Sequence, residues 1–312
     1  KTSQFQNKSF SGLFSLSSIN SSFGQLAEIE YNAFVETGSL TILILSNNQL
    51  QDFHVNVSTL SHIQEIYLNN NNIRNVSTET FSHFMLLRNL NVDHNNIIQL
   101  TNENNGPSPE AKQSNVKIID ISFNFIKVLP NNFLSSFTQL QRLDLSHNLI
   151  SSIDIHTFEG IVQLKTLDLS YNKLLAIGNA FARFVSLREL SLSNNNLTKL
   201  IDYNFVTLTN LEHLNISFNL IAGIEDNAFQ SLSKLEFLDL GHNKIETITK
   251  QLFENNAIVQ SLSLSHNKIC SIEANSFKDK NITNFSIQNN PLTGTIEKDT
   301  FNGINLDLSF NE

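Results

Sequence analysis

Four histidines occupy equivalent positions, each one residue before an asparagine that recurs along the chain: His94, His147, His242 and His266. An aspartate precedes two of them by three residues, Asp144 before His147 and Asp239 before His242. Histidine and carboxylate groups are common components of acid–base catalysis and of pH sensing. A catalytic site needs one convergent set, whereas these residues recur with a repeat and are spread along the chain. The sequence therefore disfavours an enzyme, and we expect no catalytic residues.

The chain offers little other reactive chemistry. Cys270 is the one cysteine, which excludes an internal disulfide and a paired-cysteine metal site. We expect no metal site and no cofactor. The formal net charge of -9 argues against a nucleic-acid partner, because phosphate recognition uses clustered Lys and Arg. An acidic surface instead favours basic or neutral partners.

The recurring asparagines belong to a repeated phrase, L-x-x-L-x-L-x-x-N-x-L. Around Asn148 it consists of Leu140, Leu143, Leu145 and Ile150. Self-similarity at a period of about 20 to 29 residues indicates a repeat architecture. Twelve framework asparagines mark successive ribs, at Asn48, Asn71, Asn95, Asn124, Asn148, Asn172, Asn195, Asn219, Asn243, Asn267, Asn290 and Asn311.

The L-x-L alternation predicts a short parallel strand at the start of each rib, with leucines inward and the x positions outward. Each framework asparagine can bond to backbone groups that the following turn leaves unpaired. Val57 or Ser58 stands where the rib that opens at Leu40 should carry a phenylalanine. Stacked phenylalanines are expected to fill the wide return side, from Phe34, Phe81, Phe133, Phe158, Phe181, Phe205, Phe229, Phe253, Phe277 and Phe301.

The 24-residue phrase L-x-x-L-x-L-x-x-N-x-L-x-x-I-x-x-x-x-F-x-x-L resembles the typical extracellular class of animal leucine-rich repeats. Toll-type receptor ectodomains, chaoptin-like adhesion proteins and insect secreted immune proteins contain such repeats, and the resemblance covers residues 16–311. It implies an α/β repeat fold, a leucine-rich-repeat solenoid of about 12–13 ribs of 24 residues. In this fold a parallel β-sheet forms the concave face of a curved horseshoe, and the convex returns are irregular or short-helical.

We expect residues 1–312 to form a single leucine-rich-repeat domain. Residues 16–39 form a degenerate first rib with Gly24 in place of the asparagine, 101–114 a loop insertion, and 303–312 a truncated last rib. Related ectodomains usually end in cysteine-rich caps, and neither end has one, so we expect either that the chain is part of a longer protein or that a neighbour covers its end rib. No apolar run approaches the roughly 18 residues of a membrane span.

Eight sequons are candidates for N-glycosylation, at Asn7, Asn20, Asn56, Asn75, Asn196, Asn215, Asn281 and Asn284. A random arrangement of the 45 Asn and the 55 Ser and Thr residues would give about eight. The number of sequons therefore carries no weight. An extracellular or cell-surface localisation is what the family resemblance implies.

Two groups of outward residues are candidate partner-binding positions. Ile42, Ile44 and Tyr67 place apolar side chains where polar ones are expected, and an exposed apolar patch with an aromatic is a usual anchor for protein contacts. Asp120, Asp144 and Asp168 lie on successive strands and suggest a site for a basic ligand. The alternative is that these carboxylates are ordinary repeat residues, solvated or bonded to neighbouring serines.

The sequence favours a non-enzymatic protein-recognition module of an extracellular leucine-rich-repeat receptor, adhesion protein or secreted immune factor. The expected partner is a protein ligand or co-receptor, bound through the concave face or an edge of the solenoid. The alternative is an intracellular leucine-rich-repeat scaffold or inhibitor. Homo- or hetero-oligomers are compatible with either function.

Overall fold

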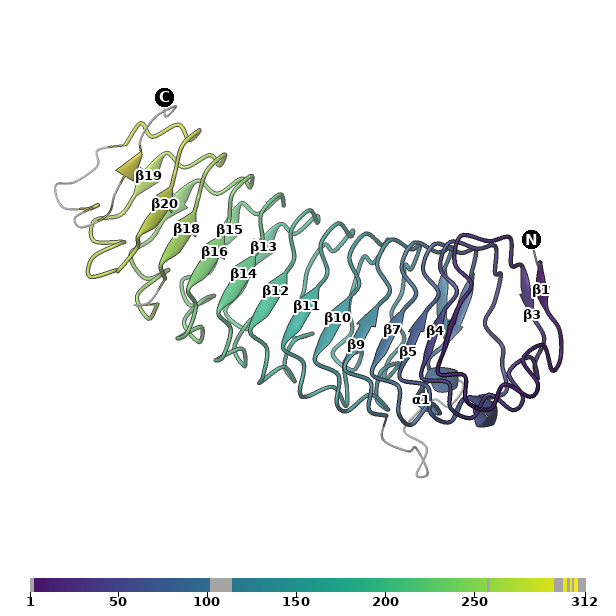
Figure 1. Cartoon of the computed structure of the whole chain (residues 1–312). Coiled ribbons are helices and arrows are strands. Elements are labelled where there is room, and N and C mark those ends of the chain that lie inside the picture. The colour runs from purple at the N-terminus through teal and green to yellow at the C-terminus, as the bar shows by residue number, and fades with distance from the viewer. Residues whose placement is uncertain are drawn as a thin grey trace. The chain divides into compact units, whose positions relative to one another are not determined.

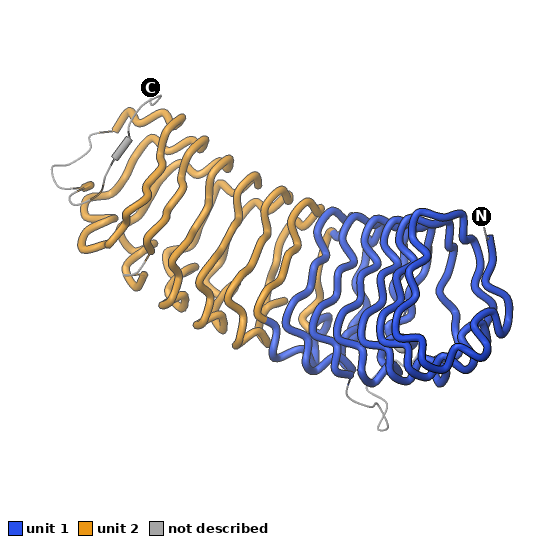
Figure 2. Tube along the Cα trace, in the orientation of Figure 1, with its two compact units in different colours: residues 1–150, 156–164 blue, residues 151–155, 165–312 orange. Residues whose placement is uncertain are grey.

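The computed structural model describes residues 3–101, 114–256, 259–294, 300–301, 304 and 306–307 (Figure 1). Most of the expected 101–114 loop and of the truncated rib 303–312 lies outside these residues. The chain divides into two compact units (Figure 2). Unit 1 comprises 1–150 and 156–164, and unit 2 comprises 151–155 and 165–312.

Unit 1 contains a parallel sheet with one strand from each rib. In order these are β2 (Ser18–Asn20), β4 (Ile42–Ile44), β5 (Glu65–Tyr67), β7 (Asn89–Asn91), β9 (Ile118–Asp120) and β10 (Arg142–Asp144). Two smaller parallel pairs are β1 (Gln4–Phe5) with β3 (Glu28–Ile29), and β6 (Asn75–Ser77) with β8 (Gln99–Thr101). Among the residues of unit 1 that the structure describes, the helices are one 3-10 turn, η1 (Val57–Leu60), and one short α-helix, α1 (Thr78–Ser82).

Unit 2 repeats the same arrangement. Its sheet strands are β11 (Thr166–Asp168), β12 (Glu189–Ser191), β14 (His213–Asn215), β16 (Phe237–Asp239), β18 (Ser261–Ser263), β20 (Asn284–Ser286) and β21 (Leu306–Asp307). On the return path β13 (Lys199–Leu200) pairs with β15 (Gly223–Ile224), and β17 (Thr247–Ile248) pairs with β19 (Ser271–Ile272). The predicted parallel-strand solenoid of leucine-rich repeats, with little helix, is thus confirmed.

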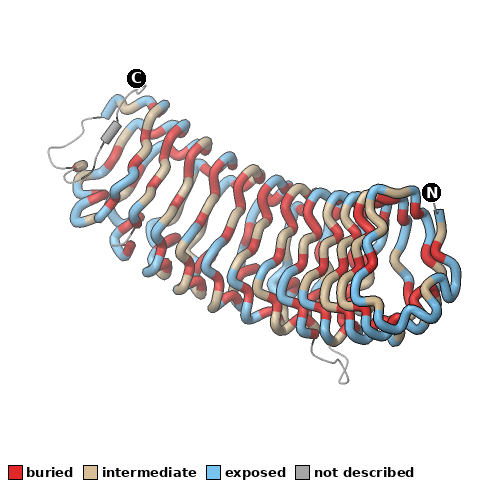
Figure 3. The backbone as a smooth tube through the Cα atoms, viewed as in Figure 1, coloured by how far each residue is buried: buried red, intermediate tan, exposed pale blue. Residues whose placement is uncertain are grey.

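The strand register follows from the alternation in the sequence. In each three-residue strand the middle residue is buried and its neighbours face outward, as with Leu143 between Arg142 and Asp144. Equivalent residues of consecutive ribs pair directly, for example Leu143 with Ile119. Figure 3 shows buried and exposed positions alternating along the ribs. We call the outward side of these sheet strands the strand face.

The framework asparagines connect each rib to the preceding one, as predicted. The amide of Asn95 is buried, its Oδ1 accepts a hydrogen bond from Ile73 N, and its Nδ2 donates to Leu68 O. Equivalent bonds recur from Asn48 to Asn290. Gly24 is explained by the same ladder, because a Cβ at this position would lie 2.6 Å from Asn48 Oδ1.

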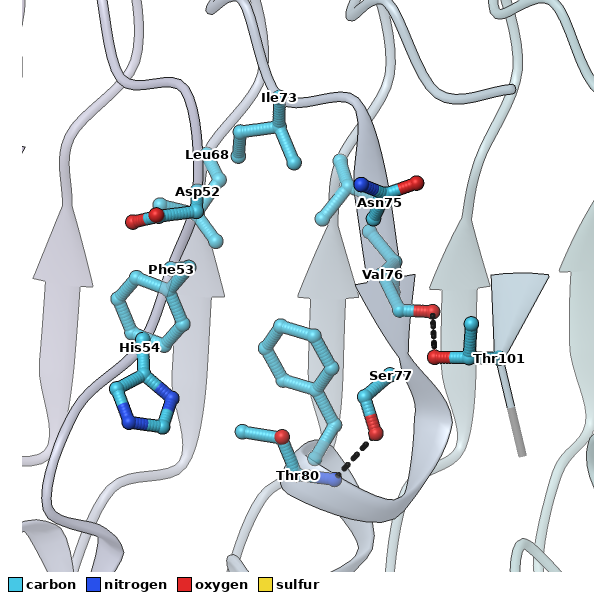
Figure 4. A pocket seen from close by; sticks show the side chains of 12 residues that line it. Asp52, Phe53, His54, Leu68, Ile73, Asn75, Val76, Ser77, Thr80 and Thr101 are labelled. Atoms are coloured by element: carbon cyan, nitrogen blue, oxygen red, sulfur yellow. Dashed lines mark hydrogen bonds between the residues drawn. The ribbon is translucent and has the colours of Figure 1, made fainter. Parts of the chain in front are cut away.

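The phenylalanine ladder fills the return side. In unit 2 the rings of Phe229 and Phe253 are stacked, with centroids 6.2 Å apart. The expected gap at Val57 or Ser58 in unit 1 is wrong, because Phe53 takes this place and stacks on Phe81 at 5.8 Å. A ring four residues upstream reaches the same space, since the return of this rib is irregular before η1. Phe53 therefore extends the ladder from Phe81 into this rib (Figure 4).

The corner after each strand adopts a left-handed backbone conformation. The residue before each framework asparagine from Asn48 to Asn290 has a positive φ, for example 47° at His94 and 51° at His147. Asparagine and histidine occupy most of these corners and are enriched in this region, whereas Phe and Tyr adopt it at a cost. Within the described ranges, none of the helices has the length and apolar character needed to cross a bilayer.

Candidate protein-binding surface

The apolar candidates lie side by side at the amino-terminal end of the strand face. Ile44 pairs with Tyr67 across β4 and β5, and Ile42 pairs with Glu65. Ile42, Ile44 and Tyr67 are each half-buried. The structure therefore brings these three sequence candidates together in unit 1, and we call them the apolar patch.

Two neighbouring side chains orient the Tyr67 ring. Its hydroxyl donates to Glu65 Oε2 at 2.8 Å and accepts from Asn89 Nδ2 at 3.1 Å. Partial burial raises the pKa of Tyr67, and the bond to the Glu65 carboxylate raises it further, because ionisation would place two negative charges together. The phenol is therefore protonated and fixed at neutral pH, and less side-chain entropy is lost when a partner packs on it.

The sequence analysis missed Glu65, Asn89 and Ile118 in this neighbourhood. All three occupy the same outward position in their strands as Ile42. Ile118 is 39% exposed and lies between Asn89 and Arg142 in the sheet. Aligning the ribs by strand position would have revealed Ile118, whereas nothing in the repeat indicates that Glu65 and Asn89 bond to a tyrosine.

The three candidate aspartates all close a turn at the end of their strand. Asp120 Oδ1 accepts from the backbone N–H and the hydroxyl of Ser122. Asp144 Oδ1 accepts from Ser146 N at 3.0 Å in the same way. Asp168, in unit 2, accepts from Ser170 N at 2.8 Å. One carboxylate oxygen of each is thus used structurally, as the alternative interpretation expected.

Charge nevertheless accumulates on this part of unit 1. Asp120 pairs in register with Asp144. Burial raises the pKa of Asp120, the hydrogen bonds from Ser122 lower it, and repulsion from Asp144 and Asp93 raises it again. A basic group of a partner docked here would relieve this repulsion. The apolar patch, Asp120 and Asp144 all lie on the unit 1 sheet, and Asp168 lies on β11 of unit 2.

The histidines form ring stacks at the corners that follow the strands. Phe123 lies between His94 and His147, with ring centroids 4.1 and 3.9 Å away. In unit 2, His242 stacks between Phe218 and His266 at 4.0 and 4.1 Å. Among the residues that the structure describes, no group of three or more His, Cys, Asp or Glu is placed to hold a metal ion. The Cys270 thiol is exposed.

None of the candidate sequon asparagines is buried. Asn7, Asn20, Asn75, Asn281 and Asn284 are exposed, and Asn56, Asn196 and Asn215 are half-buried. Asn20 pairs with Ile44 in register, so a glycan on it would stand beside the apolar patch. Asn215 lies on the strand face of unit 2, where its Oδ1 accepts from Ser217.

Comparison with known proteins agrees with this architecture. The leucine rich repeat family matches residues 38–97, 114–174, 185–245 and 238–292, together more than half of the chain. The chain therefore belongs to the leucine-rich-repeat family. This fold is typically a non-enzymatic recognition module. No curated protein sequence matches the chain.

Solved structures of other proteins share the fold. Toll from the Drosophila Toll–Spatzle complex has a TM-score of 0.75 at 20% identity and covers 85% of this chain and 36% of its own. An internalin from Listeria monocytogenes has a TM-score of 0.68 at 22% identity, covering 89% and 75%. TLR13 in complex with ssRNA13 has a TM-score of 0.54 at 23% identity, covering 97% and 57%. The chain thus spans about a third of the Toll chain.

Proposed function

We propose that this chain is a non-enzymatic protein-recognition module of an extracellular leucine-rich-repeat receptor, adhesion protein or secreted immune factor. It binds a protein ligand or co-receptor through the strand face of unit 1. Ile42, Ile44 and Tyr67 supply the apolar contacts, and Asp120 and Asp144 attract basic groups. Asp168, on β11 of unit 2, is a separate candidate for contact with a basic group.

The observation that carries this proposal is the placement of Tyr67. Its ring is half-buried beside Ile44 and its hydroxyl is fixed between Glu65 and Asn89. Aromatic side chains whose polar group is fixed by hydrogen bonds are frequent hot spots of protein interfaces. An apolar anchor with a nearby acidic group favours a partner surface that combines an apolar pocket with Lys or Arg.

The structural neighbours support a protein partner and a cell-surface or secreted location. Toll was solved with Spatzle, and TLR13 with an RNA. The formal charge of -9 and the carboxylates at Asp93, Asp120 and Asp144 oppose RNA binding to the strand face of unit 1. The prediction that nucleic acid is not a partner follows from this electrostatic argument.

Location is tested by intact mass of the protein from its native source, before and after enzymatic deglycosylation. Sugar on exposed sequons such as Asn281 or Asn284 is expected for an extracellular protein. A mass that deglycosylation leaves unchanged would favour the intracellular scaffold or inhibitor. Peptide mapping of Asn20 then shows whether a glycan stands beside Ile44.

Partner binding is tested by placing a photo-crosslinking residue at Tyr67, with the same residue at Val128 as the control. Val128 is 70% exposed and lies on the return side of the same unit. We expect position 67 to crosslink one protein from the fluid or cells that surround the native source. The crosslink should disappear in the Ile44→Asp and Asp144→Ala variants. Equal crosslinking from both positions, or crosslinks to RNA alone, would reject the proposed surface.

A further inference from the structure

Three cations lie in consecutive ribs at the margin of the strand face where the sheet strands of unit 1 begin. Arg88 and Lys117 directly precede β7 and β9, and Arg142 is the first residue of β10. Lys117 N donates to Arg88 O at 2.9 Å and Arg142 N donates to Lys117 O at 3.0 Å, so the three residues lie side by side. All three are exposed. We call them the basic margin.

The side chains of the basic margin form no ion pair and no hydrogen bond within the ranges that the structure describes. Cations of unit 2 differ in this respect, because Arg188 pairs with Glu212 and Lys199 pairs with Glu225. Arginine and lysine bind carboxylates through strong charge-assisted hydrogen bonds. The basic margin is therefore available to acidic groups of another molecule.

The repeat does not require cations at this place. From the first rib to the ninth, the residue directly before the sheet strand is Ser17, Thr41, Gln64, Arg88, Lys117, Gln141, Lys165, Arg188 and Glu212. Neutral and acidic side chains are thus accepted there as well as basic ones. The positive charge of the basic margin is a local departure from the repeat, in a chain whose formal net charge is -9.

The opposite end of the same strands is acidic. Asp120 ends β9 and Asp144 ends β10, and the two lie side by side in register. Lys117 and Asp120 are three residues apart, which is about 10 Å of extended backbone. Ile118, which is 39% exposed, lies between them. The strand face of unit 1 therefore has a positive and a negative margin with an apolar side chain between the two.

We propose that the basic margin binds acidic side chains of the protein partner, so that the partner crosses the strands in one direction, with its basic groups at Asp120 and Asp144. This inference rests on the proposed function, because it takes the partner to be a protein on the strand face of unit 1. The reversed direction would place like charges together at both margins. A polyanion would meet the two carboxylates, and a uniformly basic segment would meet the basic margin. A partner segment that carries both charges, about 10 Å apart, fits best.

The test uses two capped peptides of identical composition and zero net charge. Acetyl-Glu-Glu-Leu-Trp-Lys-Lys-amide separates its charges by the width of the strand face, whereas acetyl-Glu-Lys-Leu-Trp-Lys-Glu-amide mixes them. The chain contains no tryptophan, so the fluorescence anisotropy of the peptide indole reports binding. We expect the peptide with separated charges to bind about three- to tenfold more tightly at low ionic strength, from two to four exposed ion pairs.

The double variant Lys117→Gln, Arg142→Gln should reduce this preference to less than about twofold. The matched control is Lys244→Gln, Lys268→Gln, which removes the same charge from two exposed positions in consecutive ribs of unit 2. The control should keep the full preference. Because both peptides are neutral, a change in the net charge of the protein does not by itself produce the expected difference.

Asp120→Asn, Asp144→Asn should also remove the preference, since it takes away the negative margin. Equal affinity for the two peptides, no binding of either, or an unchanged preference in one of the two strand-face double variants would overturn the proposal. An equal loss in the unit 2 control would do so too. The crosslink from position 67 is a separate measurement. If that crosslink persists while the peptides show no preference, the partner's direction is rejected and the proposed function is not.

Discussion

Asn95 Oδ1 accepts a hydrogen bond from the backbone N–H of Ile73 at 3.0 Å. The two residues are 22 positions apart in the sequence, and the bond joins two consecutive ribs. The Asn95 amide also donates to Leu68 O of the preceding rib and to Val92 O of its own. These backbone groups lie where strand pairing ends. Without Asn95, the N–H of Ile73 would be buried and unpaired, whereas Leu68 O and Val92 O would each keep one bond, from the amides of Asn71 and Asn124.

Replacing Asn95 by Ala should therefore lower the free energy of unfolding by about 1–3 kcal/mol. The neighbouring Asn96 is exposed, and Asn96→Ala should change it by no more than about 0.5 kcal/mol. Chemical denaturation of the two variants, followed by circular dichroism, measures the difference. Equal free energies of unfolding for Asn95→Ala and Asn96→Ala would show that the asparagine ladder makes no net contribution to stability.

The ladder was predictable because every rib repeats the same bonds. A side chain that can both donate and accept, placed every 21 to 29 residues at the end of an L-x-L strand, has few structural uses. The strands and their register followed for the same reason. A one-residue slip would expose the leucines of every rib.

The candidate sites depend on contacts between side chains at variable positions of the repeat, and the repeat pattern does not predict these contacts. The contact of Phe53 with Phe81 requires an irregular return, and the bonds of Tyr67 to Glu65 and Asn89 require particular rotamers. Outward positions such as Ile44 were predictable from alternation alone.

Asp120→Asn should stabilise the protein at pH 7. Asparagine retains the oxygen that accepts from Ser122 and removes the repulsion from Asp144 and Asp93. Because the folded pKa of Asp120 is raised, its contribution to stability is present below the ordinary value of 3.8 and is lost as the pH rises through the folded pKa. We expect a gain of about 0.2–1 kcal/mol at pH 7 and none at pH 3.

Thermal unfolding of wild-type and Asp120→Asn proteins at the two pH values checks this expectation. Asp144→Asn is the matched variant and should lower the pKa of Asp120, measured by carboxyl-carbon NMR. A variant that is less stable at pH 7 would mean that the Asp120 carboxylate has a compensating cation. If Asp120→Asn also weakens partner binding, the charge serves recognition at the expense of stability.

Tyr67 should be the last tyrosine to ionise as the pH rises, because burial and the adjacent Glu65 carboxylate raise its pKa. Glu65→Gln should lower the pKa of Tyr67 only in part, since burial is the larger cause and remains. Absorbance titration at about 295 nm detects the phenolates. Tyr67→Phe should remove the ionisation step that occurs at the highest pH. Tyr203→Phe, which changes a 67% exposed ring, should leave that step in place. Loss of the highest step in Tyr203→Phe would contradict the assignment.

His266→Asn should raise the pKa of His242. Partial burial lowers that pKa below the ordinary 6.5, repulsion from the stacked His266 lowers it further, and Asp239 opposes both. Asparagine suits the left-handed corner at position 266, as Asn289 shows one rib later. A lowered folded pKa means that the unfolded chain binds the proton more readily, so stability falls as the pH drops from about 6.5 through the folded pKa.

The variant should therefore lose less stability than wild type between pH 7.5 and 5.5, and the ring-proton NMR titration of His242 should shift to higher pH. His213→Asn is the control, because the His213 ring stacks on Phe237 and does not contact His242. An unchanged His242 titration in His266→Asn would mean that burial and Asp239, without His266, set the pKa of His242. The stack would then be a packing feature without electrostatic coupling between its rings.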